Sequence, residues 1–108
     1  MRVLIGVCLL LLGLGAAALE SDPATGLTMA PGFDIVKVQC TVCHSARLIS
    51  QNRADRDGWQ AMIRWMQTTQ GLWPLGDNEA LILDYLATQY GPREAGRRAP
   101  LSADLLPP

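Results

Sequence analysis

Short stripes of apolar residues at helical spacing follow one another along most of this chain. The first stripe comprises Phe33, Val36 and Cys40, which recur at positions i, i+3 and i+7 of a helical period. Pro31 is suited to a helix start, because proline is tolerated in the first helical turn. We therefore expect a first helix that begins near Pro31 and ends near Cys43.

A longer stripe predicts a second helix over residues 57–70. Its apolar positions follow the i, i+3, i+4, i+7 pattern of a helical face that packs on a core. Gly71 comes next and is expected to end the helix as its C-terminal cap. The residues of this stripe are Trp59, Met62, Ile63 and Met66.

A third helix is expected after Asp77, because aspartate is a favourable N-cap residue. Gly91 and Pro92 end this helix, since glycine caps helix C-termini and proline cannot continue them. The residues expected on its packed side are Leu81, Ile82, Tyr85 and Leu86.

The segments outside these helices are expected to be irregular. Residues 45–56 are mostly polar, with Leu48 and Ile49 as their apolar pair, and are predicted as a loop. Residues 19–30 lack periodicity and are predicted as a flexible lead-in, and residues 93–108 as an extended proline-rich tail. Because no alternating runs typical of strands occur, the pattern predicts an all-α fold of three main helices.

The N-terminal apolar run, from Val3 to Gly15, follows the basic residue Arg2 and precedes three alanines. A basic start, an apolar run and small residues in this order are typical of a secretory signal peptide. The run is shorter than the roughly 20 residues that a membrane-spanning helix needs. We expect residues 1–18 to be removed after Ala18, which predicts a location outside the cytoplasm without stable membrane insertion.

The clearest chemistry lies in Cys40-Thr41-Val42-Cys43-His44. Two thiols three positions apart, followed at once by an imidazole, have the attachment spacing of c-type haem. The two sulfurs bind the haem covalently and the histidine ligates the iron. We therefore expect one haem c, attached through Cys40 and Cys43, with His44 as an iron ligand.

Two other readings of these cysteines are weaker. His44 is the only histidine of the chain, and no further cysteine follows it to complete a four-coordinate zinc site. A thioredoxin-like C-x-x-C site requires strands alternating with helices, which the pattern does not predict. Haem attachment is the preferred interpretation.

The formal net charge of −1 at pH 7 becomes −2 when Arg2 leaves with the signal peptide. A nearly neutral, slightly acidic chain gives no indication of nucleic-acid binding, which is typical of basic proteins. Cys8 also leaves with the signal, so both remaining cysteines belong to the haem motif and no disulfide is available.

The second axial ligand of the iron is expected to be a methionine, because the chain has no second histidine. Met29 lies close before the haem motif and would need a sharp return to reach the far side of the haem. Met62 and Met66 are four residues apart on one helix face and can both point toward the haem. We prefer Met66, near the end of its helix, and keep Met62 as the alternative.

Cationic and N–H groups are expected to hold the haem propionates. Arg53 and Arg56 lie between the haem motif and the second helix, and the indole N–H of Trp59 is a further donor. Trp65 and Trp73 are expected to pack in the core, because large aromatic side chains favour burial.

Taken together, these residues resemble the small monohaem class I-type c cytochromes of bacterial periplasms. The resemblance rests on Gly32-Phe33, the Cys40 to His44 motif and Tyr85-Leu86. It implies a small class I cytochrome c-like fold, in which the N- and C-terminal helices cross beside one covalently attached haem. It also implies a periplasmic location.

More narrowly, the chain is similar to the cytochrome subunit that accompanies bacterial molybdenum sulfite dehydrogenases. The likeness covers residues 31–92, the expected cytochrome c domain, and implies Met66 as the distal ligand. Gln70 stands where the likeness would place an aromatic residue before Gly71. The likeness is carried by Cys40-Thr41-Val42-Cys43-His44-Ser45, Leu48-Ile49, Gln51-x-Arg53, Trp59-x-x-x-Ile63-x-x-Met66, Trp73-Pro74, Asp84-Tyr85-Leu86-Ala87 and Tyr90-Gly91-Pro92.

Two classes of function fit these features. The first is a one-electron carrier, not itself an enzyme, whose potential depends on the axial methionine, burial and hydrogen bonds. Its redox partners would be a dehydrogenase, such as a molybdopterin sulfite dehydrogenase, and a downstream cytochrome or oxidase. The second is a haem protein that binds or senses a small ligand at a displaceable sixth position, which would need a polar residue over the iron.

Overall fold

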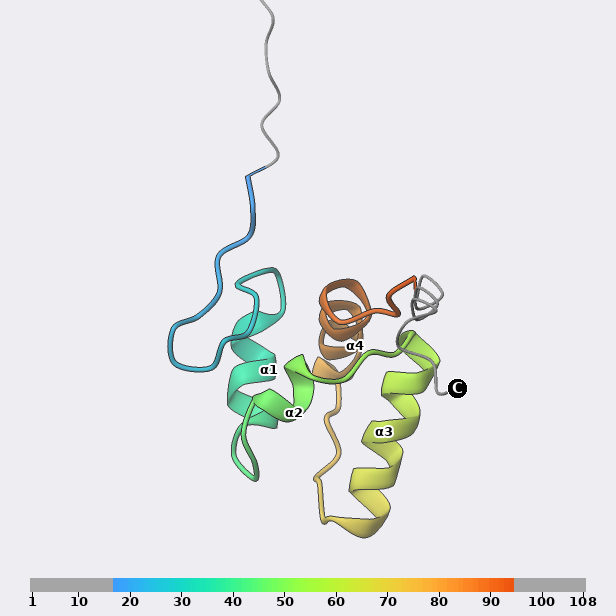
Figure 1. Ribbon diagram of the computed structural model, residues 1–108. Coiled ribbons are helices and arrows are strands. Elements are labelled where there is room, and N and C mark those ends of the chain that lie inside the picture. The colour runs from blue at the N-terminus through green and yellow to red at the C-terminus, as the bar shows by residue number, and fades with distance from the viewer. Residues whose placement is uncertain (1–16, 95–108) are drawn as a thin grey trace, which may run out of the picture.

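The computed structural model describes residues 17–94, which form four helices and no sheet (Figure 1). The expectation of an all-α chain is confirmed at this level. The predicted signal peptide, apart from its last two residues, and the predicted tail beyond residue 94 lie outside the described residues. No helix in the described part is long and apolar enough to cross a membrane. The helices are α1 (Phe33–Cys40), α2 (Arg47–Ser50), α3 (Arg56–Thr69) and α4 (Asn78–Gln89).

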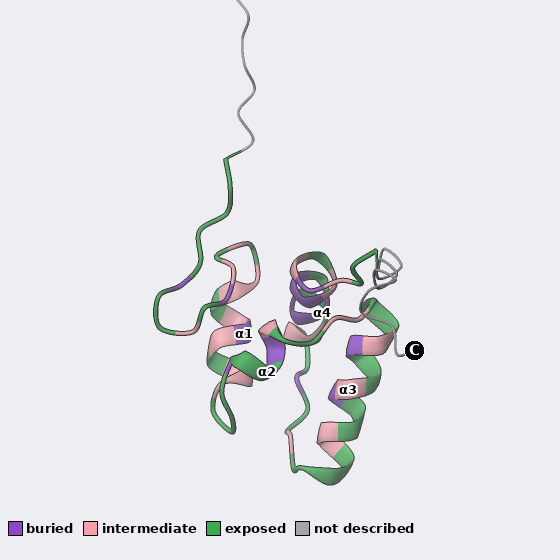
Figure 2. Ribbon diagram, in the orientation of Figure 1, coloured by how far each residue is buried: buried purple, intermediate pink, exposed green. Residues whose placement is uncertain are grey.

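Helix α4 packs against both α1 and α3, so the core forms around it (Figures 1 and 2). Its buried side chains therefore cover a wider face than one helical stripe. Leu83 is buried, whereas Leu81, which was expected on the packed side, is 50% exposed, so that expectation was wrong. The buried residues of α4 are Ile82, Leu83, Tyr85 and Leu86.

The crossing of α1 and α4 requires a glycine. Gly32 precedes α1 with a φ of 94°, a left-handed conformation that glycine adopts without steric cost. A Cβ atom on Gly32 would lie 2.9 Å from the Cβ of Tyr85 and 3.1 Å from the carbonyl oxygen of Leu81. The backbone of α1 therefore approaches α4 more closely there than any other residue would allow.

Helix α3 has well-formed ends. Asp55 is its N-cap, and its Oδ1 accepts a 2.8 Å hydrogen bond from the backbone N–H of Gly58. After Gln70 the chain turns at Gly71, whose φ of 72° confirms the predicted glycine at the end of this helix. Asp77 occupies the N-cap position of α4, as predicted, but its backbone is already helical and its side chain makes no capping hydrogen bond.

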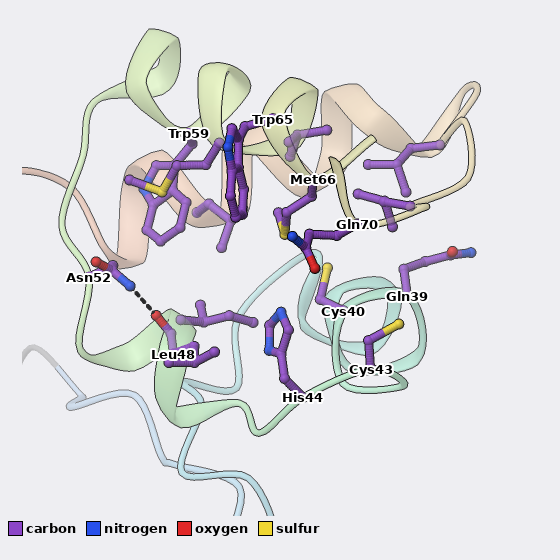
Figure 3. Close-up of a pocket in the computed structure, with 16 residues that line it drawn as sticks. Gln39, Cys40, Cys43, His44, Leu48, Asn52, Trp59, Trp65, Met66 and Gln70 are labelled. Carbon is purple, nitrogen blue, oxygen red and sulfur yellow. Dashed lines mark hydrogen bonds between the residues drawn. The ribbon is translucent and has the colours of Figure 1, made fainter. Parts of the chain in front are cut away.

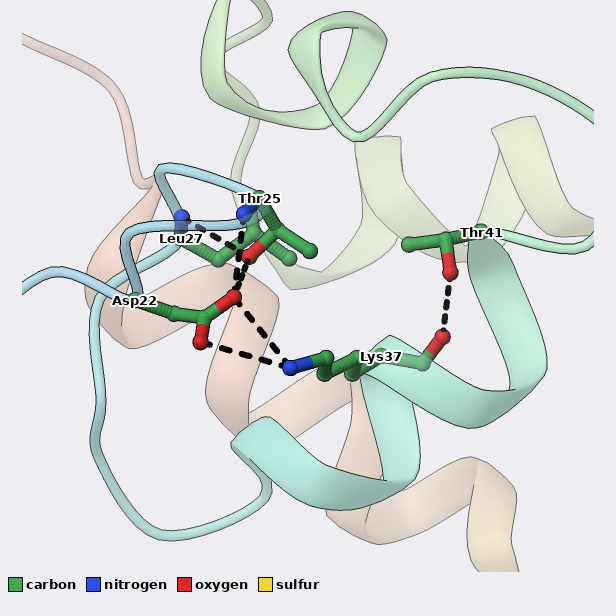
Figure 4. Close-up of polar contacts among 5 residues, drawn as sticks. All are labelled: Asp22, Thr25, Leu27, Lys37 and Thr41. Carbon is green, nitrogen blue, oxygen red and sulfur yellow. Dashed lines mark hydrogen bonds and ion pairs between the residues drawn. The ribbon is translucent and has the colours of Figure 1, made fainter.

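The segment of residues 19–30, expected as a flexible lead-in, is packed against the helices. Leu27 is fully buried, and Ser21 and Thr28 form an isolated antiparallel bridge. Asp22 accepts hydrogen bonds from the backbone N–H and hydroxyl of Thr25 and pairs with Lys37 of α1 at 3.3 Å (Figure 4). A buried leucine, a polar turn and hydrogen bonds between the Thr28 backbone and the hydroxyls of Tyr85 and Tyr90 hold this segment, and none of them produces a periodic pattern.

The loop predicted for residues 45–56 contains the short helix α2. Ala46 and Ile49 are buried against the rest of the core, so a single turn suffices to bring this segment onto it. The expected burial of Trp65 and Trp73 was wrong, because these side chains are 57% and 40% exposed. The indole N–H of Trp73 donates to Oε1 of Gln39 at 2.6 Å.

Candidate functional site

A cavity of about 540 Å³ opens between the end of α1, helix α2 and the inner face of α3 (Figure 3). This size falls within the roughly 300–1,000 Å³ range that is usual for small-molecule and cofactor sites. Its lining is mainly aliphatic, aromatic and sulfur-containing, and no Asp, Glu, Lys or Arg occurs among the described lining residues. The cavity therefore suits a large, mainly apolar group.

All three chemically active residues of the Cys-x-x-Cys-His motif line this cavity. Cys40 ends α1, and Cys43 and His44 follow in the turn toward α2. The hydroxyl of Thr41 donates to the carbonyl oxygen of Lys37 at 2.7 Å and helps to end α1 at this point (Figure 4). The end of the helix thus brings two thiols and one imidazole to the same cavity.

The two thiols differ in their surroundings. Cys40 is half-buried, and desolvation raises the pKa of its thiol to about 11. Cys43 is exposed. His44 is also exposed, and its Nδ1 lies 3.3 Å from the carbonyl oxygen of Ser45. When Nδ1 carries the proton and donates to that oxygen, Nε2 is left with its lone pair available to a metal.

The two candidate methionines, Met62 and Met66, both line the cavity from α3. Figure 3 shows the Met66 side chain pointing into the cavity toward the side from which His44 enters. The carbonyl oxygen of Met66 accepts hydrogen bonds from the N–H of Gln70 at 2.9 Å and of Leu72 at 3.2 Å. The end of α3 therefore fixes the backbone of Met66 on the wall that faces the histidine.

Arg53 and Arg56, predicted as propionate partners, are not among the lining residues. Arg53 donates to the carbonyl oxygen of Gln89 at 2.9 Å and lies over the ring of Tyr90. Arg56 forms an exposed ion pair with Asp84. Both arginines have other partners in this arrangement, and their assignment to the propionates stays a prediction.

Trp59, the third predicted propionate partner, does line the cavity. Its indole N–H, however, donates a buried 3.1 Å hydrogen bond to the carbonyl oxygen of Tyr90. In this arrangement Trp59 contributes its ring to the apolar wall and has no free N–H to offer.

Several lining residues were not predicted from the sequence to bind a cofactor, among them Asn52, Trp65, Gln70 and Leu86. The side-chain amide of Asn52 donates to the carbonyl oxygen of Leu48 (Figure 3). Gln70 had a recognisable signal, because it lies four residues after Met66 and continues the stripe of α3 by one more turn.

Within residues 17–94, no three His, Cys, Asp or Glu side chains come together as a site for a metal ion alone. In comparisons with protein-family models, with curated proteins and with solved structures, nothing matched this chain.

Proposed function

We propose that this chain is a one-electron carrier with one haem c bound covalently through Cys40 and Cys43. In this proposal His44 and Met66 would ligate the iron. The observation that carries the proposal is that one apolar cavity is lined by both thiols, by the chain's only histidine and, from the facing helix, by methionine. This donor set is that of a His/Met c-type haem.

The cavity residues fit such a group in chemistry as well as in position. The apolar rings and aliphatic side chains of the lining suit a macrocycle, while the thiols lie at the end from which attachment would occur (Figure 3). Haem, when bound, supplies an iron that cycles between the ferrous and ferric states. Cys40 and Cys43 would hold the group covalently, His44 and Met66 would ligate its iron, and the apolar lining would exclude water from the part that it covers.

Two observations support Met66 over Met62 as the distal ligand. Met66 lies in the last turn of α3, where its carbonyl oxygen accepts two hydrogen bonds and its backbone is held. Its side chain is drawn into the cavity on the side that faces His44 (Figure 3). Met62 lies one turn earlier and stays the alternative ligand.

The proposed setting is the bacterial periplasm, and it rests on the leader pattern of residues 1–18 and on the resemblance to class I-type cytochromes. The proposed electron donor is a dehydrogenase, with a molybdopterin sulfite dehydrogenase subunit as the specific candidate. A cytochrome or an oxidase would accept the electron.

One observation supports the alternative function, a haem protein that binds or senses a small ligand. It requires a polar group on the distal wall, and Gln70 lines the cavity one turn beyond Met66. Under this alternative the sixth position would be open or displaceable. The ligation state of the iron therefore distinguishes the two functions.

The test is the absorption spectrum of the protein produced together with a haem-attachment system. A carrier should carry one covalently bound haem by mass, and its oxidised form should show the weak near-infrared band of sulfur-ligated ferric haem. Met66→Ala should abolish this band, with Met62→Ala as the matched control. Loss of the band in Met62→Ala alone would reassign the ligand. A high-spin spectrum, or rapid carbon monoxide binding by the reduced protein, would favour the small-ligand function.

A further inference from the structure

The segment that connects α3 to α4 forms one wall of the cavity. Leu72 and Leu75 of this segment line the cavity, and Leu75 is buried. The same two leucines also line a second hollow of about 490 Å³, together with Arg64 and Glu79. Because the two hollows share these side chains, the segment is a thin wall with space on both sides.

A glycine stands at each end of this segment. Gly71 has a φ of 72° and Gly76 a φ of 57°, both in the left-handed region that glycine adopts without steric cost. No atom would lie within 4 Å of a Cβ added to either of them. Residues 71–76, which we call the flap, therefore have a residue at each end that can absorb the backbone rotation of a moving segment.

The flap is joined to α1 through Trp73. The indole N–H of Trp73 donates to Oε1 of Gln39 at 2.6 Å, and this is the only hydrogen bond between the flap and α1 within residues 17–94. Gln39 lines the cavity next to Cys40, and Figure 3 shows its amide pointing away from His44. A single polar contact at the surface thus closes the cavity between α1 and the flap.

The other hydrogen bonds of the flap are longer. The N–H of Leu72 donates to the carbonyl oxygen of Met66 at 3.2 Å, and the amide of Gln67 donates to the carbonyl oxygen of Trp73 at 3.4 Å. At the far end, the carbonyl oxygen of Leu75 accepts from Asn78 at 3.2 Å. The bond from Trp73 to Gln39 is therefore the shortest one that holds the flap.

We propose that the hydrogen bond between Trp73 and Gln39 is a clasp that keeps the flap closed, and that small molecules enter the cavity when this clasp opens. The inference goes beyond the proposed function, because it concerns access to the cavity, and only its readout at the iron rests on that function. Segments with few buried contacts open locally at a small cost in free energy. The clasp lies at the surface, where water replaces its hydrogen bond, so the flap opens while α3 and α4 stay folded.

The experiment uses variants of the haem-loaded full chain. Gln39→Leu and Trp73→Phe each remove one partner of the clasp, and the double variant removes both. Gln39→Glu keeps an oxygen that accepts from the indole N–H, so it should preserve the clasp. Gln51→Leu is the matched control, because Gln51 is an exposed glutamine that does not line the cavity.

Two rates follow the flap. Hydrogen exchange at the backbone amides of residues 70–78, measured by mass spectrometry, reports opening whatever ligates the iron. The rate at which exogenous imidazole binds the ferric iron reports access to the cavity. Loss of the clasp should raise both rates about twofold, the lower end of the equilibrium factor of one neutral hydrogen bond, because this bond is exposed.

The proposal is supported by a gain in both rates in each single variant, no further gain in the double variant, and the original rates in Gln39→Glu and Gln51→Leu. Unchanged exchange in both single variants overturns it, as do gains that multiply in the double variant, since the two side chains would then act independently. Faster exchange without faster imidazole binding also overturns it, because the flap would not control access. The near-infrared sulfur band tests the His/Met proposal separately, and hydrogen exchange tests the clasp even where that band is absent.

Discussion

The indole N–H of Trp59 donates a buried 3.1 Å hydrogen bond to the carbonyl oxygen of Tyr90 and so joins α3 to the end of α4. The same oxygen accepts from the backbone N–H of Ala54 at 3.1 Å, and the ring of Tyr90 lies under Arg53. The hydroxyl of Tyr90 in turn accepts from the N–H of Thr28 at 3.0 Å. Tyr90 therefore connects three segments that are distant in sequence.

Trp59→Phe should lower the free energy of unfolding by about 2–3 kcal/mol, because a buried hydrogen bond and part of a packed ring are lost together. Trp73→Phe is the matched control, since the indole of Trp73 bonds to Gln39 at the surface, and its loss should cost about 0.5 kcal/mol or less. Urea unfolding measures both. Equal losses would show that the bond to Tyr90 contributes nothing specific.

Gly32→Ala should destabilise the fold by about 2–5 kcal/mol, because its φ of 94° is strained for alanine and the new methyl group would meet Tyr85. Gly26→Ala separates the two causes. Gly26 also has a positive φ, of 71°, but nothing would lie within 4 Å of a Cβ atom added to it. Gly26→Ala should therefore lower the free energy of unfolding only by the conformational cost, about 1–2 kcal/mol. A loss in Gly26→Ala as large as in Gly32→Ala would contradict the close crossing of α1 and α4.

Asp22 should make stability depend on pH in acid. Its pKa is lowered from the ordinary value of 3.8, chiefly because the Thr25 hydroxyl donates to it, with Lys37 assisting against the opposing effect of burial. A carboxyl with a lowered pKa stabilises the fold fully above its unfolded pKa and loses this contribution as the pH falls through the folded value. In urea unfolding from pH 6 to pH 2.5, the free energy of unfolding of the original chain should therefore exceed that of Asp22→Asn. This difference should shrink toward low pH.

Lys37→Met should reduce the difference in the free energy of unfolding between the Asp22 form and Asp22→Asn near neutral pH. It removes one of the partners of the Asp22 carboxylate. A difference between the original chain and Asp22→Asn that stays constant over the whole range would show that the carboxylate charge has no role in this turn.

Cys40 and Cys43 should react at different rates in the chain produced without haem. Burial raises the pKa of Cys40 from 9.0 to about 11, which lowers its thiolate fraction at pH 8 about a hundredfold, and the thiolate is the reactive form. Iodoacetamide followed by mass mapping should modify exposed Cys43 first. Helix content by circular dichroism checks that the chain is folded, and faster modification of Cys40 would contradict its burial. In the haem-loaded protein neither sulfur should react, because both would be thioethers.

The spacing of apolar residues was sufficient to predict α3, because this helix buries one narrow stripe and is followed by a glycine with a positive φ. It was insufficient for α4, which lies between α1 and α3 and buries Leu83 on a second face while Leu81 is exposed. It also missed the packing of residues 19–30, because one buried leucine, Leu27, and a hydrogen-bonded turn leave no periodicity.

For the candidate site, local spacing identified the Cys40 to His44 motif and the methionines of α3, and the structure brings them to one cavity. Local spacing did not identify the groups to which the polar side chains near the site form hydrogen bonds. Trp59 and Arg53 both turn to backbone carbonyls near the end of α4, a region far from them in sequence. Such contacts depend on how helices meet, which a one-dimensional pattern does not encode.

The pairing of α4 with both α1 and α3 fixes an order of assembly. Because α4 contacts both helices, the walls around the Cys40 to His44 motif are held together only after α4 has docked. Before α4 docks, the two thiols are open to an attaching enzyme, so the proposed haem would be joined to an incompletely folded chain that later closes around it.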